Sequence, residues 1–139
     1  MKDELYHDRI LELARDAATE GRLESPSASA TINNPLCGDR VTIDITVEGG
    51  TLTEVRHKVR GCALCRASAA VIGATALGAA PDALREIAVD ATAMIKDGGD
   101  PPHPDWQALD AFRPVTSHKS RHDCVLLPFQ ALVEALDNI

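Results

Sequence analysis

Aromatic residues are scarce in this chain of 139 residues, where one tryptophan, one tyrosine and two phenylalanines make up 3% of the sequence. Positive charge is also in deficit, because 14 lysines and arginines face 21 aspartates and glutamates and leave a net charge of -7. Proteins that bind nucleic acid need a cationic footprint, and those that bind single strands add aromatic platforms for the bases. Both shortages therefore argue against DNA or RNA as a partner.

Long apolar segments are missing as well. The longest run of small apolar residues, 67–80, is interrupted by polar residues and glycines and is too short to span a bilayer. The amino end is too polar for a signal peptide. We therefore expect a cytoplasmic protein with no membrane partner. Because the cytoplasm keeps thiols reduced, the four cysteines indicate metal or sulfur chemistry rather than two disulfides.

Hydrophobic residues are plentiful, at 45%, which is ordinary for a folded domain. Helical spacing over 3–20 is followed by alternating apolar residues over 28–32, 40–47 and 52–59, and then by helical spacing over 65–79, 84–95 and 131–136. This order predicts an α+β fold: a three-stranded antiparallel sheet with helices packed on one face. We expect residues 1–139 to form a single domain, with an insertion around 96–114.

Three cysteine-bearing motifs lie at joints between the expected elements. They are Asn34-Pro35-Leu36-Cys37-Gly38-Asp39 before the second strand, Gly61-Cys62-Ala63-Leu64-Cys65 between the third strand and a helix, and Arg121-His122-Asp123-Cys124 just before the last helix. Cysteines at loop ends can converge in a fold, and thiolates are soft ligands for zinc or iron. Cys62 and Cys65 stand at a helix amino end, where free N–H groups and the helix dipole favour the thiolate.

These motifs resemble those of the U-type iron–sulfur cluster assembly proteins, the family of SufU, IscU and the amino-terminal domain of NifU. Residues 34–39 look like the family's Asn-Pro-x-Cys-Gly-Asp element, and Gly61-Cys62 followed by Ala67-Ser68 looks like its Gly-Cys-x-x-x-x-Ala-Ser element. Cys62 and Cys124 are 62 positions apart, and Asp123 rather than His precedes the last cysteine. That spacing is similar to the SufU branch, which carries Arg-x-x-Cys ahead of its last helix.

The resemblance implies a metal site made of Cys37, Asp39, Cys62 and Cys124. It implies Zn²⁺ in the resting state, with iron or a transient [2Fe–2S] cluster on Cys37, Cys62 and Cys124 as a further possibility. The implied partners are a PLP-dependent cysteine desulfurase, which supplies persulfide sulfur, and downstream cluster carriers or apo-proteins. The sulfur acceptor would be Cys37 in the SufU mode and Cys124 in the IscU mode.

Several alternatives stay open at the level of the sequence. The protein is either a cluster scaffold or a zinc-dependent sulfurtransferase that builds no cluster, so its standing as an enzyme is undecided. A structural zinc domain for protein interaction is the alternative from a different class. Two accessory residues join the site: Arg121, a cation beside thiolates, and Cys65, which is either a reserve thiol or a small packed side chain. We expect His122 to be solvated and His57 to be a partly buried sheet residue.

Overall fold

The computed structural model describes residues 4–35 and 38–139. A 3₁₀ turn, η1 (Glu4–Tyr6), and helix α1 (Asp8–Arg15) come first, followed by strands β1 (Ala28–Asn33), β2 (Arg40–Glu48) and β3 (Thr51–Arg60). Helices α2 (Ala63–Thr75) and α3 (Pro81–Asp97), the 3₁₀ segments η2 (Pro104–Ser117) and η3 (Lys119–Arg121), and helix α4 (His122–Asp137) complete the chain. No helix in the described part of the chain is long and apolar enough to cross a bilayer.

The sheet is an antiparallel meander with β2 in the centre. Side chains alternate across it, and Val41, Ile43 and Ile45 of β2 are fully buried on one face. The opposite face is polar, with Arg40, Lys58 and Arg60 exposed. One face of the sheet is therefore packed on a core and the other faces solvent, as the alternating sequence pattern predicted.

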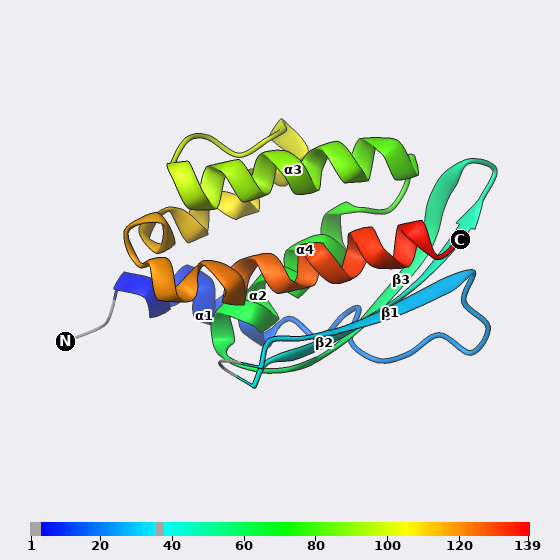
Figure 1. Cartoon of the computed structure of the whole chain (residues 1–139), viewed down its shortest axis with the longest axis horizontal. Helices are drawn as coiled ribbons and strands as arrows, with labels where there is room; N and C mark the ends of the chain where they lie inside the picture. Colours follow the sequence, from blue (N-terminus) through cyan, green and yellow to red (C-terminus); the bar gives the residue numbers. More distant parts are fainter. Residues whose placement is uncertain (1–3, 36–37) are drawn as a thin grey trace.

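The helices cover only the apolar face of the sheet (Figure 1). Helix α4 packs on β1 and β2, while α2 packs against β3 and α4. Helix α3 and segment η2 lie on α4, where the rings of Trp106 and Phe129 are 5.9 Å apart. The predicted α+β class and its layer order are confirmed.

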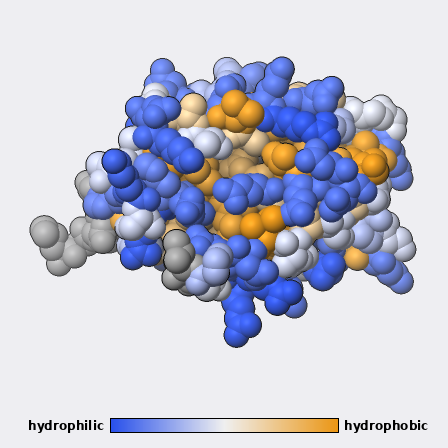
Figure 2. All heavy atoms as spheres, viewed as in Figure 1, coloured by the Kyte–Doolittle hydropathy of each residue, from blue (hydrophilic) through white to orange (hydrophobic). Residues whose placement is uncertain are grey.

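An apolar groove runs between α3 and α4, and Figure 2 shows apolar atoms exposed on this face. Ala88 and Val89 of α3 line it from one side, and Phe129 and Val133 of α4 from the other. The groove belongs to the carboxyl-terminal half of α4, whereas Cys124 lies near the amino end of that helix. It is therefore separate from the candidate site.

Helix α1 ends at Arg15 and is therefore shorter than the helix that the spacing over 3–20 predicted. The next residues serve the sheet instead: the His57 N–H donates to the Thr19 carbonyl at 2.9 Å, and the Gly21 N–H donates to the His57 carbonyl at 2.8 Å. Strand β3 is an edge strand, whose backbone groups need partners from outside the sheet. That demand comes from a distant part of the chain and outweighs the local helical pattern.

Helix α4 begins earlier than predicted, at His122, so Cys124 lies within its first turn rather than before it. The negative charge of Asp123 in that turn stabilises the amino end of α4 by interacting with the helix dipole. His122 was expected to be solvated, but only 8% of it is exposed. Its Nε2 lies 2.9 Å from the Thr116 carbonyl oxygen, and this hydrogen bond ties the start of α4 to η2.

Candidate metal centre

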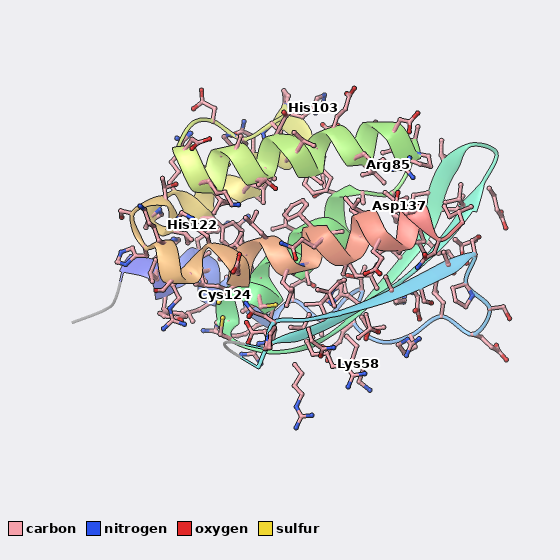
Figure 3. All side chains as sticks on the ribbon, viewed as in Figure 1. Lys58, Arg85, His103, His122, Cys124 and Asp137 are labelled. Carbon is pink, nitrogen blue, oxygen red and sulfur yellow. The ribbon has the colours of Figure 1, made fainter. Side chains whose placement is uncertain are left out.

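Three side chains from distant parts of the sequence converge at one end of the sheet. Asp39 ends the β1–β2 connection, Cys62 is the N-cap of α2, and Cys124 is in the first turn of α4. One ligand atom from each lies within 4.8 Å of the others. Figure 3 shows Cys124 near the amino end of α4, at the end of the molecule where β1 leads into β2. Each of the three cysteine motifs thus has a member at this position.

The β1–β2 connection holds Asp39 through its own backbone. The Asn34 N–H donates to the Asp39 carbonyl, and the Gly38 N–H donates to the Asn34 carbonyl, both at 2.8 Å. Gly38 has a φ of 74°, a left-handed conformation that favours glycine over any residue with a Cβ. Asp39 is only 6% exposed, so these backbone hydrogen bonds hold a buried carboxylate.

Gly61 lacks a side chain at the position where the Asp39 carboxylate packs. Arg40 and Arg60 pair directly across β2 and β3, so the next residues outward along these strands, Asp39 and Gly61, face each other. A Cβ on Gly61 would lie 2.8 Å from both Cγ and Oδ1 of Asp39. The carboxylate therefore occupies the space that a side chain at Gly61 would need. This role follows from the pairing of β2 with β3 and cannot be read from the motif.

The chemistry of these groups fits a metal ion. Asp39 Oδ2 is buried and accepts no hydrogen bond from any residue that the structure describes. A buried carboxylate oxygen without a partner is costly, and a cation offsets that cost. Two sulfurs and one carboxylate oxygen are also a donor set that zinc or iron accepts. Cys37, the remaining ligand implied by the family resemblance, lies outside the described residues.

The electrostatics of the site favour a thiolate on Cys62. A hydrogen bond with Cys124 lowers the pKa of Cys62 to about 6, against the opposing effect of burial. The backbone N–H groups of Cys65 and Leu64 at the start of α2 act in the same direction, while the Asp39 charge opposes them. Arg121 has a raised pKa through its electrostatic interaction with Tyr6 and its hydrogen bond to Cys124. A cation therefore lies beside the sulfurs.

Two further residues clarify how the site is built. The Ser68 hydroxyl donates to the Val125 carbonyl at 2.6 Å in the buried space between α2 and α4. It joins the helix that begins after Cys62 to the turn that carries Cys124, a role that the Ala-Ser motif did not disclose. Cys65 is fully buried in the hydrophobic core, and its sulfur is not among the clustered ligand atoms.

Comparison with known proteins shows the family to which the chain is similar. The model of the NifU-like N terminal domain family matches residues 5–124. Over 94 residues the chain is 27% identical to the iron-sulfur cluster assembly scaffold protein IscU 1 of Archaeoglobus fulgidus, covering 68% of this chain and 61% of that relative, less than two thirds of its length. It is 23% identical to the zinc-dependent sulfurtransferase SufU of Bacillus subtilis, covering 94% of this chain and 88% of that one. The crystal structure of a NifU-like protein (N-terminal) from Brucella abortus has a TM-score of 0.91 at 35% identity, covering 97% of this chain and 94% of that chain.

Proposed function

The chain belongs to the NifU-like N-terminal domain family, and from that premise we propose that it accepts persulfide sulfur from a PLP-dependent cysteine desulfurase and serves as a scaffold or carrier for iron–sulfur cluster biogenesis. The observation that carries this proposal is the convergence of Asp39, Cys62 and Cys124 within 4.8 Å. The names of the two relatives, a cluster assembly scaffold and a zinc-dependent sulfurtransferase, support it. The reduced thiols it requires suit a cytoplasmic location.

In the resting state we propose that Cys37, Asp39, Cys62 and Cys124 hold Zn²⁺. Three thiolates and one carboxylate are a donor set that would suit zinc, and the buried Oδ2 of Asp39, which accepts no hydrogen bond from the described residues, supports a cation at this place. When bound, zinc keeps its thiolates deprotonated and polarises an incoming ligand. Iron or a transient [2Fe–2S] cluster would use Cys37, Cys62 and Cys124 in the scaffold mode.

Sulfur acceptance needs only thiol–disulfide chemistry. A thiolate of this chain attacks the outer sulfur of the desulfurase persulfide, the S–S bond of that persulfide breaks, and the desulfurase cysteine leaves as a thiolate. A new S–S bond forms on this chain, so no outside oxidant or reductant is consumed. We propose Cys37 and Cys124 as the candidate acceptors, with Arg121 offsetting the negative charge beside Cys124.

The test combines metal analysis with sulfur transfer from radiolabelled cysteine in the presence of desulfurase. We expect about one Zn²⁺ per chain and a label on the protein that thiol reductant releases. Cys62→Ala should lose most of the metal. Asp39→Ala should keep metal on three thiolates and water, but should slow the release of sulfur.

Fe²⁺ and an anaerobic visible spectrum then separate the two modes of function. Charge-transfer bands in the spectrum would identify the protein as a cluster scaffold. A protein that keeps its zinc and carries labelled sulfur would be a sulfur carrier. A chain that binds zinc only to remain folded, and accepts no label, would be a structural zinc domain and would refute the proposal. A Cys62→Ala protein with full metal content would also contradict it.

A further inference from the structure

The outer face of the sheet carries a group of cations beside the candidate site. Arg40 on β2 and Lys58 and Arg60 on β3 are exposed, and they alternate with residues such as Val41 that are buried toward the helices. Figure 3 shows Lys58 extending from the side of the sheet opposite the helices. Asp39 directly precedes Arg40 in the chain, and Gly61-Cys62 directly follows Arg60. These cations therefore lie at the same end of the sheet as the candidate ligands.

The cations line a hollow of about 450 Å³, which we call the cationic hollow. Its lining residues are Arg22, Arg40, Thr42, Lys58, Val59 and Arg60. Arg22 is already committed, because its Nε and Nη2 donate to the fully buried Asp44 carboxylate at 2.7 and 3.1 Å. Arg40, Lys58 and Arg60 form no ion pair or side-chain hydrogen bond within residues 4–35 and 38–139. Among the described residues nothing pairs with these three positive charges, so they can meet an anionic group from a partner.

The position of these charges is costly for the isolated fold. Arg40 and Arg60 are directly opposite each other on neighbouring strands, and like charges in such a pair are destabilising. The chain has 21 acidic residues, yet the cross-strand neighbours at this end are Asn33, Thr42 and Thr31 rather than carboxylates. A like-charge pair that no described residue compensates, beside the candidate site, is best explained by an anionic partner that covers it.

We propose that the cationic hollow docks an acidic surface segment of the protein that delivers sulfur, an inference that rests on the proposed function. Cross-strand neighbours are about 5 Å apart and diagonal ones about 7–8 Å, so the three cations can each meet a carboxylate of one Asp- or Glu-rich segment. A macromolecular partner that covers the hollow also reaches the adjacent ligands. Nucleic acid is the weaker occupant, because the chain has a net charge of -7 and few aromatic residues to stack on bases.

The experiment measures binding and sulfur transfer between the full chain and the cysteine desulfurase of its source organism, at low and high salt. The test variant combines Arg40→Glu, Lys58→Glu and Arg60→Glu. Its control is Lys96→Glu, a single charge reversal at an exposed position near the end of α3. Circular dichroism and zinc content verify that each variant keeps its fold and metal.

We expect the triple reversal to weaken binding by about tenfold or more at ~0.05 M salt and the difference to shrink at ~0.5 M, because salt screens exposed charges. Lys96→Glu should stay within about twofold of the parent. A triple variant that binds and accepts sulfur like the parent would overturn the docking inference and leave the proposed function intact. Duplex DNA that blocks transfer at physiological salt would reassign the hollow to nucleic acid. A parent protein that neither binds the desulfurase nor accepts its sulfur would overturn both.

Discussion

Gly61→Ala is the smallest change that tests how the site is built. The added Cβ would lie 2.8 Å from Cγ and Oδ1 of Asp39, whereas ordinary contact begins at 3.4 Å. The carboxylate must therefore retreat by about 0.6 Å, the difference between these two distances. Gly61 is not among the glycines with positive φ, so alanine can adopt its backbone conformation and the contact is the main perturbation.

A retreat of that size matters for metal binding. Metal–ligand distances are fixed to within about 0.2 Å, so with the proposed ligand set the displaced carboxylate would leave the coordination sphere or strain it. Changes around a metal site commonly cost 10–100-fold in affinity, which is about 1.4–2.8 kcal/mol. We expect Gly61→Ala to weaken zinc binding by a factor in this range while the protein stays folded, as thermal unfolding would verify.

Two assays address this expectation. Competition with a chelator gives the zinc affinity, and the visible spectrum of the Co²⁺-loaded protein reports whether a carboxylate remains in the ligand set. In an Asp39→Ala background most of the cost of Gly61→Ala should disappear, because the remaining contact is the 3.2 Å approach to the Asp39 Cβ. The reasoning fails if Gly61→Ala equals the parent in both assays, or if it costs as much without the carboxylate.

Three further predictions concern the surrounding fold. Burial lowers the pKa of His57, whose ring nitrogens have no hydrogen-bond partner among the described residues, so the unfolded chain binds this proton at a higher pH than the folded chain does. Stability should then drop by up to ~1.4 kcal/mol per pH unit as the pH falls below 6.5, and urea unfolding of His57→Leu should show a flatter profile. Burial raises the pKa of Asp44, but hydrogen bonds led by that of Arg22 outweigh it and lower the pKa overall. Arg22→Met should therefore destabilise the fold at pH 7, and destabilise it less as the pH falls through the range in which Asp44 gains its proton. Urea unfolding at neutral and acidic pH measures this difference, and equal losses at both pH values would contradict the prediction. Cys65→Ser should keep its zinc but melt at a lower temperature, since a hydroxyl replaces a fully buried sulfur; loss of zinc would make Cys65 a ligand.

The fold was predictable because its main signals are local. Alternation along 40–47 and 52–59 anticipated β2 and β3 to within a residue at each end. The amino end of α4 was missed, since Arg121 is its N-cap and none of the usual Ser, Thr, Asn or Asp caps marks that position. Residues 16–20 were wrongly predicted as helix, because the helical pattern cannot disclose that the edge strand β3 needs backbone partners.

The motifs indicated which side chains to bring together, but not what holds them there. Asp39, Cys62 and Cys124 stand in three motifs whose order resembles a known family, and the structure brings them within 4.8 Å. The roles of Gly61 and Ser68 depend on the β2–β3 register and on the packing of α2 against α4. Both are relations between distant segments, which a single sequence does not encode in any local pattern.

The three proposed ligands that the structure describes are held in different ways, which indicates which of them can leave a bound metal. Cys62 and Cys124 are fixed at the starts of two helices that the buried Ser68 hydrogen bond joins. Backbone hydrogen bonds hold the main chain at Asp39, and its carboxylate occupies the space beside Gly61. No hydrogen bond from the described residues retains its Oδ2. A carboxylate is also a harder ligand than a thiolate and binds zinc less firmly. With the proposed ligand set, a partner that competes for the metal would displace Asp39 without disturbing either helix. Because Arg40 of the cationic hollow is the next residue along β2, the proposed docking there would act on the segment that must move.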